Sequence, residues 1–379
     1  MRILQVSHGW TEGGSALYAD ALAGALASRA LVDRFGPEDV TGKRARGFVG
    51  TLRDPAAEAS FRARLGGVDL VHIHHLSGLS LSLPVVAARE GVPVVITLHD
   101  YWLACARGQL INLGGERCAG PKPDRCAACL APDLWAPVPA ALAARLPPRR
   151  GPIAQRVELW REIREKTSLF LAPSRHVATR LGVPATLLGL PLLRHVSPAP
   201  VAPSGVLRLL FLGSWLPTKG PQVLLEAFSR LPAGAAVLTL AGPSPPWRGS
   251  TVWADALKRR ARATPGVRVL GHLAGDAVAE TLVGHDVLVL PSTWEENAPL
   301  VVGEALAAGL RVLASDVGGV SEVAPEARLV EAGDVAALTA ALANEVRRGR
   351  GRCPPVARPS MEAHAWAIFN LYESILAAG

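Results

Sequence analysis

The sequence contains no uninterrupted apolar run long enough to cross a bilayer. It also lacks a cleavable signal pattern in residues 1–7 and any G-x-G-x-x-G motif after an expected strand. Charged residues make up only 19% of the chain, whereas apolar residues reach 49%, a balance that excludes a disordered protein. These absences argue against a membrane-spanning protein and against a dinucleotide-dependent oxidoreductase. They predict a cytoplasmic protein with well-packed cores.

The charge balance is modestly basic, with a formal net charge of +8 over 379 residues. An excess of this size suits anionic partners such as nucleoside diphosphates or an acidic membrane surface. No nucleic-acid-binding motif accompanies it, so nucleic acid is not expected as a partner. The basic run at 145–150 and the charged helix expected at 155–166 leave peripheral contact with a membrane open, although a solvated surface helix is the more ordinary interpretation.

Strand-like apolar runs alternate with helical segments along most of the chain. Strands are expected at 69–74, 92–98 and 208–213. Helical spacing follows the first and the last of these, an irregular stretch follows the second, and the strand content is weak only at 30–68. Such alternation predicts parallel sheets covered by helices on both faces. The expected fold class is therefore α/β, with two doubly wound, Rossmann-like parallel-sheet domains.

A Pro-rich segment near residues 189–205 is expected to connect these domains. The first domain then covers 1–192 and carries a Cys-rich, irregular insertion at 104–150. The second domain covers 193–360. A final helix is expected at 361–379.

The segment 291–322 places two carboxylates, Glu296 and Glu304, eight positions apart. On one continuous helix their side chains would lie roughly 80° apart around the axis. If Glu296 lies in a loop and Glu304 on the next helix, both can face one pocket. Pro299 suits the opening of that helix, where the free N–H groups favour an anion such as a diphosphate.

This segment resembles the donor-site signature of retaining glycosyltransferases of the GT-B fold, family 4, also called glycosyl transferases group 1. The resemblance covers nearly the whole chain and implies two domains facing a cleft, with the last helix crossing back onto the first domain. The matching residues are Pro291, Ser292, Glu296, Pro299, Leu300, Val301, Glu304, Ala305, Ala307, Gly309, Asp316, Gly318, Gly319 and Glu322.

The resemblance also implies roles for the residues of the signature. Glu304 holds the ribose hydroxyls of a nucleotide sugar, and Glu296 acts as a catalytic residue that contacts the transferred hexose. Backbone N–H groups after Glu296 meet the diphosphate. The donor-binding loop consists of Asn297, Ala298, Pro299 and Leu300.

A second element, residues 211–220, resembles the family's G-R-x-x-P-x-K-G element, whose Arg and Lys neutralise the donor diphosphate. Lys219 matches the Lys and Gly213 the first Gly. Ser214 stands at the Arg position, so one cation is missing unless another residue such as Arg248 replaces it. A cation is needed there because negative charge develops on the leaving diphosphate.

Glycines near two other strands complete the expected donor site. Gly13 and Gly14 follow the first strand, where the absence of a Cβ lets backbone N–H groups approach an anion. Their spacing alone is a weak signal, but the family has a GG loop at this place. Gly242, after a strand of the second domain, is a further donor-binding candidate.

Histidines cluster after the strands of the first domain. The family has a His beside the reacting sugar carbon, which implies that His99 is a catalytic residue that hydrogen-bonds the donor sugar or phosphate. His72 and His74 alternate onto one face of their strand and lie next to His75. A polar cluster lining the acceptor cleft is favoured here over a metal site.

The insertion holds four of the five cysteines, in a C-x12-C-x7-C-x2-C pattern; the fifth is Cys353. Four thiolates can hold a tetrahedral Zn²⁺, but only one C-x-x-C knuckle is present. A structural zinc, an iron–sulfur cluster and uncoordinated thiols therefore remain open, and disulfides are not expected in a reducing cytosol. The four candidate ligands are Cys105, Cys118, Cys126 and Cys129.

The resemblance implies a retaining hexosyltransferase that moves a sugar from a nucleoside-diphosphate donor to a carbohydrate or lipid-linked acceptor hydroxyl, in polysaccharide or glycolipid assembly. It implies no cofactor for catalysis. Two alternatives stay open: a non-catalytic nucleotide-sugar-binding relative, kept by the Ser214 departure, and a nucleotide-sugar epimerase. The donor base, sugar and acceptor are not specified by the sequence.

Overall fold

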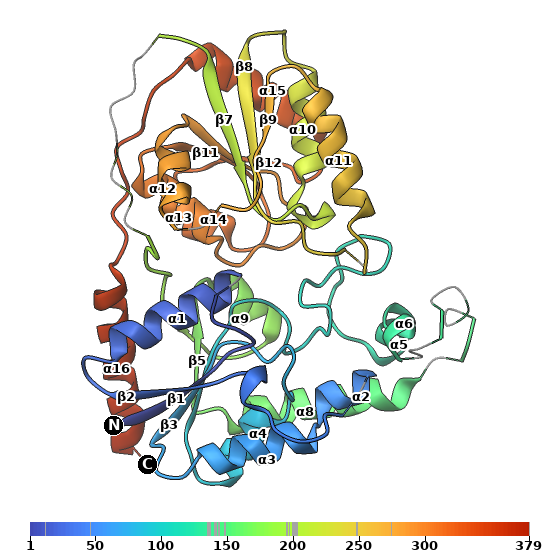
Figure 1. The fold of residues 1–379 in the computed structure, drawn as a ribbon, viewed down its shortest axis with the longest axis vertical. Helices are drawn as coiled ribbons and strands as arrows, with labels where there is room; N and C mark the ends of the chain where they lie inside the picture. Colours follow the sequence, from blue (N-terminus) through green and yellow to red (C-terminus); the bar gives the residue numbers. More distant parts are fainter. Residues whose placement is uncertain are drawn as a thin grey trace. The chain divides into compact units, whose positions relative to one another are not determined.

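The chain divides into two compact units in the computed structural model, Met1–Gly189 with Ser360–Gly379, and Leu190–Pro359 (Figure 1). The first unit therefore contains both ends of the sequence. The residues described are 1–11, 13–45, 47–134, 138–139, 142, 145–147, 149–194, 196, 198, 204–247, 249–273 and 275–378.

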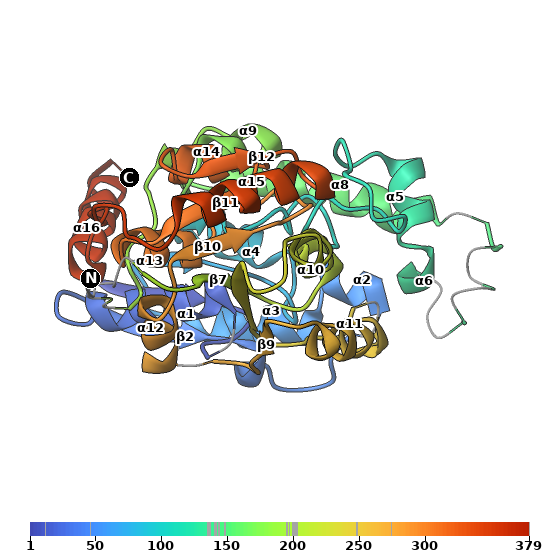
Figure 2. The same ribbon diagram turned by 90° about the horizontal axis from the view of Figure 1, so that it is seen from above.

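The first unit is built on a six-stranded parallel sheet with the order β2-β1-β3-β4-β5-β6. Its strands are β1 (Arg2–Val6), β2 (Leu31–Phe35), β3 (Leu70–Ile73), β4 (Val94–Thr97), β5 (Leu169–Ala172) and β6 (Thr186–Leu187). Its main helices are α1 (Gly14–Leu26), α2 (Gly47–Leu52), α3 (Pro55–Arg64), α4 (Leu83–Arg89), α8 (Arg150–Lys166), α9 (Arg175–Leu181) and α16 (Met361–Ala378). Helix α1 packs against α16 (Figure 2), and α4 packs against α3 and α8 (Figure 1).

The second unit repeats this plan with the order β12-β11-β10-β7-β8-β9. Its strands are β7 (Leu207–Leu212), β8 (Ala236–Ala241), β9 (Val267–Val269), β10 (Val287–Leu290), β11 (Arg311–Ser315) and β12 (Arg328–Val330). Its helices are α10 (Pro221–Ser229), α11 (Val252–Ala263), α12 (Asp276–Val283), α13 (Leu300–Ala307), α14 (Val320–Val323) and α15 (Val335–Arg348). The expected α/β class with two Rossmann-like sheets is confirmed.

Both faces of the second sheet are buried, because alternate residues of each strand enter different cores. Leu209 and Phe211 of β7 pack with residues of α10, α11 and α15. Leu210, between them, packs with residues of α12 and α13. This two-sided burial explains why β7 is a nearly continuous apolar run instead of an alternating one.

Helix α16 is attached to the first unit by two buried hydrogen bonds. The hydroxyl of Tyr372 lies 2.5 Å from Nδ1 of His72 on β3, and Nε2 of His364 lies 2.7 Å from the hydroxyl of Tyr18 on α1. All four side chains are at most 2% exposed. These polar contacts fix the position of α16, which apolar packing alone would leave free to slide.

Two stretches hold more structure than the sequence indicates. Residues 30–68 contain β2, α2 and α3, and the expected irregular insertion contains α5 (Pro123–Cys129) and α6 (Ala131–Leu134). Strand β2 was hard to recognise because it is an edge strand with mostly partly exposed residues. Among the helices described, none is both long and apolar enough to cross a membrane.

Candidate functional site

Lys219 and Glu296 form an ion pair in the second unit. Nζ of Lys219 donates to Oε1 of Glu296 at 2.7 Å, and the hydroxyl of Ser292 donates to the same oxygen at 2.6 Å. Glu296 is only 3% exposed, whereas the Lys219 side chain is 23% exposed and lies over the Trp294 ring. A buried carboxylate needs such partners to remain charged. The first expected catalytic carboxylate and the expected diphosphate cation are therefore direct neighbours.

Two glycines allow the loops around this pair to approach each other. Gly220 follows Lys219 with φ of 73°, and a Cβ there would lie 1.8 Å from the carbonyl oxygen of Pro291. Gly318 has φ of 59°, and a Cβ there would lie 1.9 Å from the carbonyl oxygen of Glu296. Both the left-handed backbone and the close contact exclude a side chain. The loops after β7, β10 and β11 thus meet around Glu296.

Glu304 lies on α13 and has a cationic partner of its own. Nη1 of Arg194 donates to Oε1 of Glu304 at 2.7 Å, and Glu304 is 3% exposed. Burial raises the pKa of Glu304, and the guanidinium opposes that rise. Arg194 comes from the segment that follows the first unit, 110 positions away in sequence. Sequence reasoning missed it, because nothing in a Pro-rich connector indicates a partner for a distant carboxylate.

The expected donor loop leads into the N-terminus of α13. Asn297 is 3% exposed, Ala298 and Leu300 are partly buried, and Pro299 is the N-cap residue of the helix. Pro299 precedes the first helical residue, so the helix keeps all its own N–H donors. These first N–H groups have no partners within a helix and are suited to an anion.

Gly213 and Gly242 lie at the ends of β7 and β8. The N–H of Gly213 donates to the carbonyl of Ala241 at 3.0 Å, which extends the pairing of these strands. The backbone carbonyl of Ser214 accepts the N–H of Leu216 at 2.8 Å. Ser214 therefore supplies a tight turn but no charge, and Arg248, the expected substitute, lies outside the described residues.

The other expected donor glycines belong to the first unit. Gly13 is the N-cap residue of α1 with φ of 89°, and Gly14 is the first residue of that helix. Both are exposed, and a Cβ on Gly13 would meet nothing within 4 Å. The N-terminus of α1 is thus open to solvent, while Glu12 lies outside the described residues.

His99 follows β4 in the first unit, beside other histidines. Its Nε2 lies 3.4 Å from Nδ1 of His74, and Tyr18 contacts the His99 ring edge-on at 5.0 Å between ring centroids. Burial, reinforced by the neighbouring His74, lowers the pKa of His99 well below its usual value. The imidazole is therefore neutral near pH 7 and suited to hydrogen bonding, not to carrying a charge.

His72 and His74 are expected to line an acceptor cleft, and the structure contradicts this expectation for His72. They share one face, with ring centroids 4.2 Å apart, but they are 0% and 3% exposed. His72 is bonded on both ring nitrogens, to Tyr372 and to Thr97. A strand covered on both faces buries both sets of alternating side chains, so His72 serves to attach α16. His75 is only partly buried and bonds Asp100 at 3.1 Å.

Acid is expected to destabilise the first unit. Burial lowers the pKa of His72 to about 3 and that of His364 to about 4. An unfolded histidine titrates near 6.5, so between these values the unfolded chain binds more protons and the free energy of unfolding falls as the pH falls. The free energy of unfolding of the first unit is measured in guanidinium at several pH values between 4.5 and 8.

The His72→Gln variant should be less stable at pH 7 and should show a flatter dependence on pH. His272→Gln is the matched control, because His272 is exposed in the second unit. If the free energy of unfolding of His72→Gln depended on pH as steeply as that of the native protein, His72 would not be a source of the acid sensitivity.

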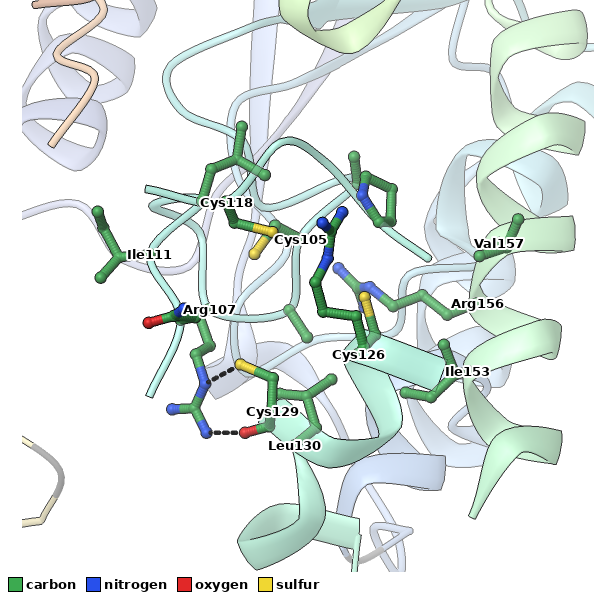
Figure 3. Close-up of a pocket in the computed structure, with 16 residues that line it drawn as sticks. Cys105, Arg107, Ile111, Cys118, Cys126, Cys129, Leu130, Ile153, Arg156 and Val157 are labelled. Atoms are coloured by element: carbon green, nitrogen blue, oxygen red, sulfur yellow. Dashed lines mark hydrogen bonds between the residues drawn. The ribbon is translucent and has the colours of Figure 1, made fainter. Parts of the chain in front are cut away.

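The four cysteines of the insertion line a common pocket beside α5 and α8 (Figure 3). All four are reduced and partly buried. Within the described ranges, no group of three or more His, Cys, Asp or Glu side chains is positioned to hold a metal ion. The pocket belongs to the first unit and contains none of the residues expected to bind a donor.

Comparison with known proteins identifies the second unit. Residues 207–347 match the family described as Glycosyl transferases group 1. A phosphatidyl-myo-inositol mannosyltransferase of Mycolicibacterium smegmatis is 31% identical over 185 residues, 45% of this chain and 46% of that protein. The chain thus matches about half the length of this curated relative. The match of residues 207–347 supports the group 1 glycosyltransferase expected from the signature, while the family 4 and retaining assignments stay predictions.

The fold of the whole chain is similar to that of solved glycosyltransferase structures. Sucrose-phosphate synthase from Thermosynechococcus elongatus is 20% identical, with a TM-score of 0.69 and full coverage of both chains. HepE of Anabaena, in complex with UDP and glucose, is 17% identical, with a TM-score of 0.62 and coverage of 100% of this chain and 98% of that one. At these identities the likeness establishes the fold, which is GT-B.

Proposed function

We propose that this chain is a retaining glycosyltransferase that moves a hexose from a nucleoside-diphosphate sugar to an acceptor hydroxyl. The observation that carries the proposal is the buried Lys219–Glu296 ion pair within a group 1 domain. Burial takes the Glu296 carboxylate out of water, and the partly exposed Lys219 and the Ser292 hydroxyl compensate it. Carbohydrate or lipid-linked acceptors fit the proposal, in polysaccharide or glycolipid assembly.

The donor would lie along the residues of the second unit. Glu304 would take the ribose hydroxyls, Lys219 the diphosphate and Glu296 the hexose, while the N-terminus of α13 would add its free N–H groups to the phosphates. A relative that is a mannosyltransferase and a fold neighbour crystallised with UDP and glucose both support a hexose donor, with UDP as the first nucleotide to test.

Donor binding would exchange partners within the ion pair. Lys219 is the more exposed member, so it can turn to the diphosphate and leave the Glu296 carboxylate to accept hydrogen bonds from the sugar. Lys219 and the helix N-terminus would then stabilise negative charge on the leaving diphosphate. The leaving phosphate oxygen would take the acceptor proton on the same face. No cofactor is needed for these steps, and neutral His99 would donate a hydrogen bond to the donor.

A non-catalytic nucleotide-sugar-binding protein is the second candidate, favoured by Ser214 in place of the family's Arg. A nucleotide-sugar epimerase on the same fold is the third. A thermal-shift screen of UDP-, GDP-, ADP- and TDP-sugars identifies the donor, because a ligand of the folded state raises the melting temperature. Incubation of that donor with and without acceptors then separates the candidates.

Each outcome of that incubation has a distinct meaning. Acceptor-dependent release of the nucleoside diphosphate with retained anomeric configuration supports the proposal. Binding without turnover identifies the binding protein, and a new nucleotide sugar formed without acceptor identifies the epimerase.

A protein that is cytoplasmic and touches the membrane only peripherally should also be recovered without detergent.

Arg194→Ala is expected to weaken UDP binding about tenfold, because it leaves the buried Glu304 carboxylate without its partner. Without the guanidinium, burial alone would act on Glu304, so its pKa should rise further and binding should weaken toward acidic pH. The dissociation constant of UDP is measured by calorimetry at several pH values. The matched control is Arg328→Ala, which removes an exposed arginine of the same unit.

A ribose-specific effect has a further signature. UDP lacking the 2′ and 3′ hydroxyls should bind the native protein and Arg194→Ala with similar affinity. If Arg194→Ala lost the same affinity for UDP and for UDP without these hydroxyls, Arg194 would not position Glu304 for the ribose. The transferase proposal would be unaffected.

A further inference from the structure

A buried, incompletely paired arginine faces the cysteine pocket of the first unit. Arg156 extends from α8 and is 4% exposed (Figure 3). Its Nη2 donates to the backbone carbonyls of Trp102 and Leu103, and its guanidinium lies 4.9 Å from the Trp102 ring centroid. Nε and Nη1 are buried and, within the described residues, have no hydrogen-bond partner. An uncompensated buried cation is strongly unfavourable, so negative charge in the pocket would stabilise the guanidinium of Arg156.

The cysteines are the available source of that charge. The pocket lining contains four cysteines and no Asp, Glu or His among its described residues. Protonated thiols are neutral and cannot compensate a guanidinium. Thiolates form outright when they coordinate a metal ion. The unpaired N–H groups of Arg156 therefore indicate that the cysteines are coordinated to a metal ion as thiolates.

A second guanidinium contacts the same cluster. Nε of Arg107 donates to Sγ of Cys129 at 3.3 Å, and Nη2 donates to the backbone carbonyl of Cys129 at 2.8 Å (Figure 3). Nη2 also pairs with Asp133, so the charge of Arg107 is shared. An N–H donated to a cysteine sulfur is the contact that orients a thiolate ligand and lowers its charge.

We propose that the four cysteines of the insertion bind one Zn²⁺ ion as thiolates and that Arg156 and Arg107 compensate the charge of this centre. Binding releases the four thiol protons to solvent and leaves the tetrahedral centre with two negative charges. The all-sulfur donor set selects a soft, thiophilic ion and disfavours Mg²⁺ and Ca²⁺, which require oxygen ligands.

The sulfurs must close on the ion, since the described residues hold no preformed metal geometry. Cys126 and Cys129 lie one helical turn apart on α5, where they already form one side of the site. Cys105 and Cys118 lie in the preceding loop, which contains no helix among its described residues. Backbone hydrogen bonds hold both cysteines there, because the carbonyl of Cys105 accepts from the N–H of Gly108 and the N–H of Cys118 donates to the carbonyl of Leu110. Closure on the ion therefore has to move the thiol side chains and adjust these turns.

Metal analysis of the full-length protein, purified without chelators, is the primary test. The expected result is about one zinc ion per chain, with Cys118→Ser and Cys129→Ser each losing most of it. Cys353→Ser is the matched control and should retain zinc, because that cysteine lies in the second unit. Absence of zinc, equal loss in Cys353→Ser, or iron with acid-labile sulfide would overturn the proposal.

Addition of Zn²⁺ alone to chelator-treated wild-type protein is the second test, and it does not depend on whether the cysteine variants fold. Zinc should restore resistance to proteolysis within residues 104–130. Co²⁺ should give the absorption bands of a tetrahedral thiolate site. Cleavage that is unaffected by zinc would overturn the proposal.

The role of Arg156 is tested through affinity. Arg156→Gln should weaken zinc binding about 10- to 100-fold in competition with a chromophoric chelator, as the loss of a supporting contact does at other zinc sites. Arg125→Gln is the matched control, because Arg125 also lines the pocket but is exposed. If the two variants bound zinc with equal affinity, Arg156 would not support the zinc site. None of these measurements depends on the proposed transferase activity.

Discussion

Glu296→Gln is expected to lower kcat about 10²- to 10³-fold, the loss typical of one preorganised electrostatic contact in an active site. The amide keeps the shape of the side chain and can still accept from Ser292 and Lys219. It cannot offer negative charge to a hexose whose anomeric carbon becomes positive as the diphosphate leaves. Transfer is measured as acceptor-dependent release of the nucleoside diphosphate.

Nucleotide binding separates this loss from misfolding. The affinity for the nucleoside diphosphate should change little in Glu296→Gln, since that ligand lacks the hexose. Glu331→Gln is the matched control, because it neutralises an exposed carboxylate of the same unit. Turnover of Glu296→Gln at the level of Glu331→Gln would rule out a catalytic role for Glu296.

Gly318→Ala is expected to destabilise the second unit by about 2–5 kcal/mol and to abolish most turnover. A left-handed alanine costs about 1–2 kcal/mol. Displacement of the backbone at Glu296, whose carbonyl oxygen would lie 1.9 Å from the new Cβ, adds about 1–3 kcal/mol. The displaced loop also carries the Glu296 carboxylate away from Lys219. Denaturant unfolding gives the first effect, and kcat gives the second.

Gly333→Ala isolates the contribution of backbone strain. Gly333 has φ of 80°, but a Cβ there would meet nothing within 4 Å. This variant should lose only about 1–2 kcal/mol and keep its activity. Equal losses in the two variants would show that contact with Glu296 contributes nothing.

The sequence predicted those features that depend on local pattern. The strands expected at 69–74, 92–98 and 208–213 are present as β3, β4 and β7, because each is a largely buried apolar run with clear breaks. The fold class followed from the same patterns, and the group 1 match of residues 207–347 was expected from the signature. The edge strand β2 was missed, since partial exposure removes the continuous apolar character on which the prediction relied.

Pairings across long stretches of chain were beyond sequence reasoning. The partner of Glu304 is 110 positions away and the partner of His72 is 300 positions away, and neither distance leaves a local pattern. His72 was therefore interpreted as a cleft residue, although it is fully buried and hydrogen-bonded on both ring nitrogens. The roles of Lys219 and Glu296 remain predictions, while their contact is a structural fact.

The return of α16 to the first unit has a consequence for biosynthesis. The ribosome must complete the whole second unit before it makes the residues that cover His72 and Tyr18. During that interval the nascent first unit exposes an apolar surface, and closing a loop of this length is slow. The second unit, which is continuous in sequence, can fold earlier and independently. Transient capture by a chaperone that binds apolar surfaces would thus be directed at the first unit.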